Sequence, residues 1–216
     1  MKLIDTFQDE HVLIEQVLGS FRVYVDGLVQ GTAAPDDGKR FAAFFTEFAG
    51  RFHHEREEQV FFDALVKEAE LPAERGPVFA VMCEHAEMEE WLREMVPLLE
   101  HGLPSGDPGE RLKAMAVRYS HALWRHIDAE NSVLYPEGAE RLRRCGVHEL
   151  PDRPMSESEA AAREGAAALL LRYPPVEDAA LTRGEGCFMC RSHGDTCKGL
   201  EAEWWSDLEW DEFFMK

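Results

Sequence analysis

The chain is poor in basic residues and has no long apolar run. It carries 23 lysines and arginines against 42 aspartates and glutamates, a formal net charge of −19 over 216 residues. Because so negative a chain repels phosphate groups, we expect neither nucleic acids nor anionic membranes as partners. No apolar stretch approaches the roughly 18–20 residues of a membrane-spanning helix. Asp5, Asp9 and Glu10 interrupt the region where a signal peptide would be continuously apolar.

Cysteine is also scarce and odd in number. Five cysteines cannot all pair within one chain, and three of them gather at Cys187, Cys190 and Cys197. A secreted protein held together by disulfides would use an even, regularly spaced set. We therefore expect a cytoplasmic protein whose thiols stay reduced and available for metal.

Strand-like alternation of apolar and polar residues is missing from the first two-thirds of the chain. Four long segments instead repeat apolar residues at helical steps of three and four. The breaks between them are short and rich in turn residues, which makes neighbouring helices antiparallel. We predict an all-α fold, an up-down antiparallel four-helix bundle over residues 1–147. Residues 148–216 are predicted to be an extension with a short helix capped by Ser156 and Glu159, a Cys/His cluster and an acidic, aromatic tail.

Each of the four predicted helices carries one histidine within its apolar face. In the second segment, steps of three and four lead from Ala49 through His53 and Glu57 to Val60. The other three stripes have the same form. Each histidine is followed four residues later by a glutamate, and the pairs are His11 and Glu15, His53 and Glu57, His85 and Glu89, and His126 and Glu130.

The remaining histidines are expected outside this set. His54 shares its face with Glu47 and Arg51, so it is expected near the edge of the bundle or in solvent. His121 lies among charged neighbours on a predicted flank. His101 lies on the far side of its helix from His85, and His148 and His193 follow the bundle.

Four histidines inside one bundle need a physical reason. Burying ionisable groups costs several kcal/mol each unless they are paired or bound to metal. Imidazole and carboxylate ligands without thiolate favour iron or manganese over a closed structural zinc site. Two octahedral ions bridged by Glu57 and Glu130 would use the whole set and leave positions for a bridging oxygen and for small ligands.

The four helix motifs resemble a known family. "DEHVLIEQVL", "FHHEREEQVFF", "CEHAEMEEWLREM" and "HIDAENSVLYP" look, in order, like the four helices of the hemerythrin-like (HHE cation-binding) domain, over about residues 5–145. The resemblance implies a di-iron centre, oxo- or hydroxo-bridged, with bridging glutamates and capping histidines. The implied ligands are His11, His53, Glu57, His85, His126 and Glu130.

One departure from the family pattern concerns oxygen carriage. Oxygen-carrying hemerythrins have a second histidine four residues after the one in the third helix, and here that position holds Glu89. This favours redox chemistry over simple reversible oxygen carriage. Glu89 is a tentative seventh ligand and Glu15 a weaker one, and both could equally belong to the acidic surface. Tyr119 is predicted to face inward, either as an ordinary core residue or as a hydrogen-bond donor or redox group.

The extension holds a second candidate metal site. Cys187, Cys190, His193 and Cys197 lie within 11 residues and could close a tetrahedral zinc or iron site. A redox-active pair of Cys187 and Cys190, or unliganded thiols, are the alternatives. The aromatic tail is expected to pack on the bundle, on a second subunit as a homodimer, or on a protein partner.

The expected function is that of a cytoplasmic non-haem di-iron protein that binds or reacts with oxygen, peroxide or nitric oxide, in sensing, stress response or iron handling. Whether it is an enzyme is left open. The alternatives are a regulatory or interaction module gated by metal, and an iron store or buffer without catalysis.

Overall fold

The described part of the chain is helical throughout. The computed structural model describes residues 1–104, 106 and 109–176, and no strand occurs among them. The predicted all-α class is therefore confirmed. None of the helices within these ranges is both long enough and apolar enough to cross a membrane.

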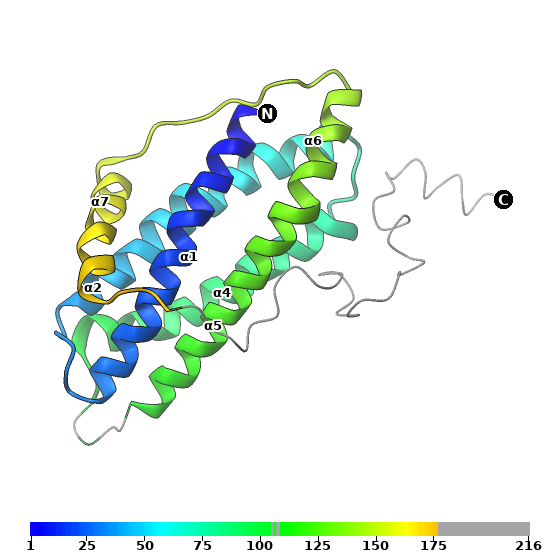
Figure 1. The fold of residues 1–216 in the computed structure, drawn as a ribbon. Coiled ribbons are helices and arrows are strands. Elements are labelled where there is room, and N and C mark those ends of the chain that lie inside the picture. The colour runs from blue at the N-terminus through cyan, green and yellow to red at the C-terminus, as the bar shows by residue number, and fades with distance from the viewer. Residues whose placement is uncertain (105, 107–108, 177–216) are drawn as a thin grey trace.

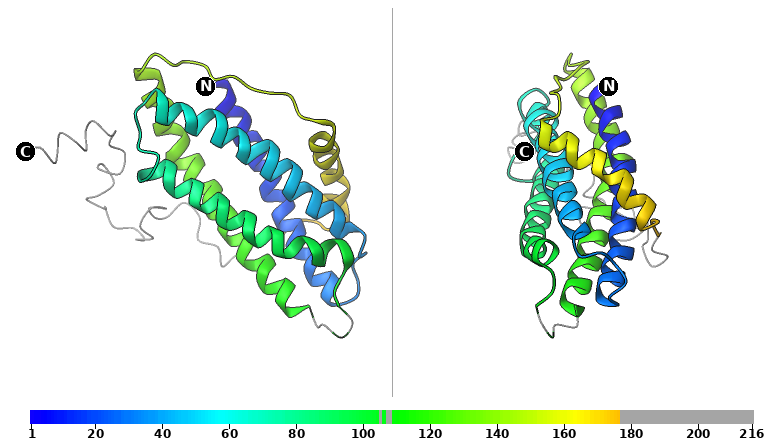
Figure 2. Two further views of the ribbon diagram at one scale, coloured as in Figure 1. Left: turned by 180° about the vertical axis from the view of Figure 1, so that it is seen from behind. Right: turned by 90° about the vertical axis from the view of Figure 1, so that its left-hand side faces the viewer.

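Long helical rods run alongside one another (Figures 1 and 2). The first is α1 (Lys2–Val29) and the third is α4 (Gly76–His101). The second combines α2 (Asp37–Ala43), η1 (Phe44–His54), η2 (Glu57–Phe62) and α3 (Asp63–Lys67). The fourth combines α5 (Glu110–Ala129), η3 (Glu130–Leu134) and α6 (Tyr135–Arg144). These bounds follow the predicted segments, while the strict up-down order of four helices stays a prediction.

A further helix, α7 (Glu157–Arg172), packs on the outside of the rods against α1, α2 and η1 (Figure 2). The predicted cap is confirmed: the Ser156 side chain accepts from the Glu159 backbone N–H, and the Glu159 carboxylate accepts from the Ser156 N–H. Ala166 and Leu169 belong to the same apolar core as residues of α1 and η1. The beginning of the extension is thus part of that core, and the border predicted at residue 147 stays a prediction.

The apolar core is divided into two clusters along the length of the rods. The smaller one contains Phe7, Val81 and Leu134, and the larger one contains Ile14, Met88 and Leu123. On every rod, the buried histidines and glutamates lie between residues of the smaller apolar cluster and residues of the larger one. The sequence therefore leaves one polar layer at mid-height, closed at both ends by apolar side chains.

Parts of two rods are π-helical, with hydrogen bonds from residue i to i+5. These parts are η1 and η2 in the second rod and η3 in the fourth. A π-helix has a wider turn than an α-helix, so the rotation from one residue to the next is smaller. Such segments occur often at functional sites, and here all three border the polar layer.

Candidate metal centre

Seven ionisable side chains from all four rods meet in the polar layer. They are His11 on α1, His53 and His54 on η1, Glu57 on η2, His85 on α4, His126 on α5 and Glu130 on η3. All are buried, and Glu57, Glu130 and His53 have no exposed surface at all. Their donor atoms form two groups: cluster 1, defined by His11, His53, Glu57 and Glu130, and cluster 2, defined by His54, Glu57, His85 and His126.

In cluster 1, two histidine ring nitrogens each lie close to a carboxylate oxygen. His53 Nε2 lies 3.4 Å from Glu57 Oε1, and His11 Nε2 lies 3.3 Å from Glu130 Oε2. Metal–ligand distances of 2.0–2.2 Å place neighbouring donors of one ion about 3 Å apart and opposite donors about 4 Å apart. These separations therefore fit the donor set of a single ion.

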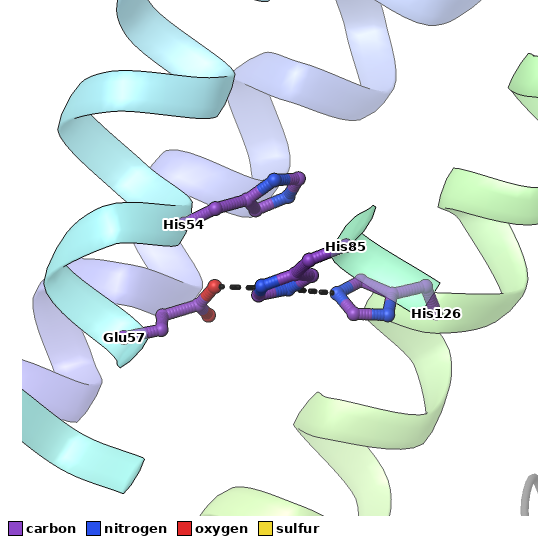
Figure 3. Close-up of side chains that lie close together, drawn as sticks. All are labelled: His54, Glu57, His85 and His126. Atoms are coloured by element: carbon purple, nitrogen blue, oxygen red, sulfur yellow. Dashed lines mark hydrogen bonds and ion pairs between the residues drawn. The ribbon is translucent and has the colours of Figure 1, made fainter. Parts of the chain in front are cut away.

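In cluster 2, three imidazoles point toward one another and toward Glu57 (Figure 3). His85 Nε2 lies 2.9 Å from His126 Nε2 and 3.6 Å from Glu57 Oε2. The His54 ring stacks on the His85 ring with centroids 4.0 Å apart. Cluster 2 is thus richer in histidine than cluster 1.

Both glutamates lie between the two clusters. Glu57 directs Oε1 at His53 and Oε2 at His85. Glu130 directs Oε2 at His11 and Oε1 at His126, 3.3 Å from its Nε2. Each carboxylate thus offers one oxygen to each side, so both glutamates would be shared if each cluster held an ion.

Outer hydrogen bonds fix which nitrogen of each ring faces inward. The Nδ1 atoms of His53, His85 and His126 lie 2.7–2.8 Å from the carboxylates of Glu10, Glu58 and Glu84, and His11 Nδ1 lies 3.0 Å from the Asn131 side-chain oxygen. Since these partners only accept, Nδ1 carries the proton and donates. Nε2 is then the ring nitrogen directed into the centre, as in carboxylate–histidine–metal groups.

Several of the inward atoms have no hydrogen-bonding partner of their own. Buried and unsatisfied are His53 Nε2, His54 Nε2, Glu57 Oε2 and both oxygens of Glu130. In addition, His85 Nε2 and His126 Nε2 approach to 2.9 Å; although burial opposes it, the charges and hydrogen bonds of Glu130 and Glu84 raise the pKa of His126 well above its ordinary value, so without a metal ion a proton lies between these two nitrogens. Buried polar atoms are nearly always satisfied, so this set fits bound cations: it gathers nitrogen and carboxylate-oxygen donors in one layer without polar partners for several of them.

Burial and mutual repulsion shift the pKa values in the centre. Desolvation, and then the neighbouring His11, lowers the pKa of His53 to about 3; desolvation and His126 lower that of His85 to about 3. Desolvation also lowers the pKa of His54 well below its ordinary value. Desolvation and the Glu130 charge raise the pKa of Glu57 well above its usual range. These three imidazoles are therefore neutral at pH 7, the form that binds metal.

A buried arginine completes the support of His53. Arg56 is 2% exposed, lies over the Phe52 ring and donates to Glu10 at 2.8 Å and to Asp152 at 2.9 Å. Glu10 in turn holds His53 Nδ1. This chain of contacts connects the centre with the segment that precedes α7.

Sequence reasoning placed six of the seven residues in the centre, although their binding of metal stays a prediction. His54 was placed wrongly: it is buried in cluster 2, because the α-helical rotation assumed for it does not hold in the π-helical η1. Tyr135, whose hydroxyl donates a hydrogen bond to Glu57 Oε1, was missed altogether. The outer acceptors Glu10, Glu58 and Glu84 were missed too; each lies close in sequence to an inward histidine, but the histidine that it holds is on another rod.

The tentative ligands lie elsewhere. Glu89 is exposed and pairs with Arg93 at 2.9 Å, and Glu15 is half-buried on α1 outside both clusters. Tyr119 is buried but contacts Phe45 and not the centre. Cys187, Cys190, His193 and Cys197 lie outside the described residues.

A cavity of about 820 Å³ between η1 and α4 reaches the centre from one side. Its inner end is formed by His54 and His85, and its walls are largely apolar, with Phe45, Met88 and Leu92 among them. Glu58, which holds His85, also lines it. Two residues of cluster 2 thus border the cavity.

The comparisons with known proteins identify one family. The family model described as "Hemerythrin HHE cation binding domain" matches residues 2–137, which include every residue of the two clusters. Comparison with curated proteins and with solved structures gives no match.

Proposed function

The chain belongs to the hemerythrin HHE cation-binding family, and from this premise we propose that it is a non-haem di-iron protein whose centre binds or reacts with oxygen, peroxide or nitric oxide. The observation that carries the proposal is the placement of Glu57 and Glu130. Each offers one oxygen to cluster 1 and the other to cluster 2. Two ions that share two carboxylates use every unsatisfied inward atom.

The donor set supports iron in particular. Five imidazoles and two carboxylates without thiolate suit iron or manganese, and they exceed the four ligands of a structural zinc ion. When bound, iron would supply open coordination positions and one-electron redox chemistry.

The chain's own residues prepare the site for this chemistry. Glu10, Glu58 and Glu84 hold the imidazoles in one tautomer, so the lone pairs are oriented before any ion arrives. The two apolar clusters exclude water from both ends of the polar layer. The cavity beside His54 and His85 supports entry of small neutral ligands at cluster 2. A cytoplasmic location is part of the proposal and is supported by two exposed free thiols, Cys83 and Cys145.

The proposal is tested by metal analysis joined to absorption spectroscopy. Protein from iron-replete cells is expected to hold about two iron ions per chain, and its visible spectrum is expected to change on adding oxygen to the reduced protein or nitric oxide. Full occupancy by zinc alone, or an iron spectrum inert to oxygen, peroxide and nitric oxide, would refute it.

Matched variants locate the chemistry. Glu57→Gln removes a bridging carboxylate, so we expect it to lose iron and the spectral response. Glu89→Gln changes an exposed glutamate that pairs with Arg93, and we expect it to keep both. If Glu89→Gln instead lost iron, Glu89 would be a ligand in solution, and the ligand set proposed above would be wrong.

A further inference from the structure

Tyr135 reaches the donor atoms of cluster 1 directly. Its side chain has no exposed surface, and its hydroxyl donates a hydrogen bond to Glu57 Oε1. The same hydroxyl oxygen lies 3.4 Å from His11 Nε2. Both neighbours are atoms that face the position of an ion, so the Tyr135 oxygen lies among the metal donors and not behind them.

The surroundings hold the phenol ring firmly in this place. The ring stacks on the His11 imidazole, with centroids 5.6 Å apart and planes within 10°, and on Phe7 with centroids 5.9 Å apart. Phe61 meets it edge-on. Tyr135 is also the first residue of α6, directly after the π-helical η3 that carries Glu130. Its position is therefore set by the same segment that sets a bridging carboxylate.

The contact with His11 is electrostatically unfavourable without a cation. His11 Nδ1 donates to Asn131, so Nε2 presents a lone pair. The Tyr135 hydroxyl proton is directed at Glu57, so its oxygen also presents a lone pair toward His11. Two facing lone pairs are stabilised by a positive ion that both can bind.

The two clusters also differ in a way that Tyr135 balances. Cluster 2 has three imidazoles and Glu57, with Glu130 Oε1 3.3 Å from His126 Nε2, whereas cluster 1 has two imidazoles and both carboxylates. On the side of cluster 1, the Tyr135 oxygen is the further donor. The 3.4 Å between the Tyr135 oxygen and His11 Nε2 falls between the separations of about 3 Å for neighbouring donors and about 4 Å for opposite donors of one ion.

Resting on the proposed di-iron centre, we propose that Tyr135 is itself a ligand, binding the iron of cluster 1 through its phenol oxygen. The phenol gives up its proton to solvent as the iron binds, because a coordinating group must be deprotonated. The added anionic oxygen makes the position at cluster 1 the harder one, which favours trivalent iron there. The two positions are then chemically different, and only cluster 2 opens on the cavity.

The test uses the full-length protein loaded with iron and oxidised. A tyrosinate bound to ferric iron gives a visible charge-transfer band and resonance-enhanced vibrations of the phenol ring. We expect both in the wild-type protein. We expect Tyr135→Phe to lose both while keeping its iron, since the ring stacking on His11 is retained. The control is Tyr24→Phe, which removes a buried hydroxyl that bonds to the Pro35 carbonyl on another part of the chain; it should keep both signals.

The readouts separate this inference from the proposed function. Iron content and the response to oxygen or nitric oxide decide the function. The tyrosinate signals decide the role of Tyr135. Two bound irons without such signals, or signals that persist in Tyr135→Phe, would overturn the inference and leave the phenol as a hydrogen-bond donor to Glu57. Should Tyr135→Phe fail to fold, wild-type protein grown with ring-deuterated tyrosine serves instead: the resonance-enhanced vibrations must shift, and unshifted vibrations refute a tyrosine ligand.

Discussion

At the scale of single residues, each imidazole of the centre has its two nitrogens in different environments. One nitrogen of His53, His85 and His126 donates to a carboxylate, and the other is directed at the partners across the layer. The inward histidines could be predicted from spacing because apolar residues on both sides fix the face. Their acceptors could not be predicted in the same way. Glu10, Glu58 and Glu84 each lie on a different rod from the histidine that they hold, and only the packing of the rods brings these pairs together.

Replacing His54 tests whether its imidazole is the third histidine ligand in cluster 2. We expect His54→Ala to reduce the iron content from about two ions per chain to about one, because the remaining donors of cluster 2 are fewer. Metal analysis by mass spectrometry measures this. His121→Ala, on α5 outside both clusters, serves as the control and should retain both ions. Unchanged iron content in His54→Ala would remove His54 from the ligand set.

Glu84 tests the outer hydrogen bonds. It accepts from His126 Nδ1 at 2.8 Å, so we expect Glu84→Gln to weaken iron binding about 10- to 100-fold. Competition with a chelator gives the affinity. Glu90→Gln, an exposed change on the same helix α4, should bind iron as the wild type does. Equal affinity of Glu84→Gln and wild type would mean that the tautomer of His126 is fixed by something else.

At the scale of helices, the π-helical segments decide which neighbours in sequence share a face. Prediction from α-helical spacing located the rods and their ends closely, and it found the capping box of α7. It misplaced His54 because neither composition nor periodicity marks η1 as π-helical. Tyr135 was missed for a related reason, since its contact with Glu57 crosses from α6 to η2.

Glu159 is predicted to stabilise α7 in a pH-dependent way. Hydrogen bonds from Arg153, and from Ser156 at the cap, lower the pKa of Glu159 to about 2 from an ordinary value near 4.5, against the opposing effect of burial. A depressed carboxylate pKa stabilises the fold above the unfolded value, and this stabilisation is lost as the pH falls through about 4.5 toward 2. We expect Glu159→Gln to lower the free energy of unfolding by about 1–2 kcal/mol at pH 7.

Urea unfolding at several pH values measures this effect. The difference between Glu159→Gln and wild type should shrink below pH 4. Glu157→Gln changes an exposed acid in the same first turn and should cost no more than a few tenths of a kcal/mol. A difference that is independent of pH would show that the carboxylate charge is not responsible.

Gly38 is predicted to be required for the contact between α2 and α4. A Cβ at this position would lie 2.1 Å from the Leu99 carbonyl oxygen and 2.7 Å from the Tyr24 hydroxyl. Because the nearer atom belongs to the backbone, we expect Gly38→Ala to lower the free energy of unfolding by about 1–3 kcal/mol. Gly165→Ala, where a Cβ meets nothing within 4 Å in α7, should raise it by about 0.5–1 kcal/mol. Denaturant titration compares the two, and a neutral Gly38→Ala would show that the helices can separate without cost.

At the scale of the whole molecule, the centre is a layer of buried polar atoms between two apolar clusters. Removing the ions should leave these atoms desolvated and unpaired. A metal ion present at about a hundred times its dissociation constant stabilises the folded state by about 2.7 kcal/mol. We therefore expect chelation to lower Tm by roughly 5–10 °C for a chain of this size. Calorimetry measures this; ferrous iron should restore Tm and magnesium should not. A Tm that chelation leaves unchanged would contradict the requirement for cations.

The spacing of the proposed ligands along the chain also predicts the order of events in assembly. The centre draws on positions 11, 53, 54, 57, 85, 126 and 130, so an unfolded chain offers an ion no more than a local pair or triplet of them. The complete set exists once all four rods have come together. We therefore expect this chain to fold first and to take up its ions afterwards, so that the cell's supply of metal controls how much of an already folded pool becomes active.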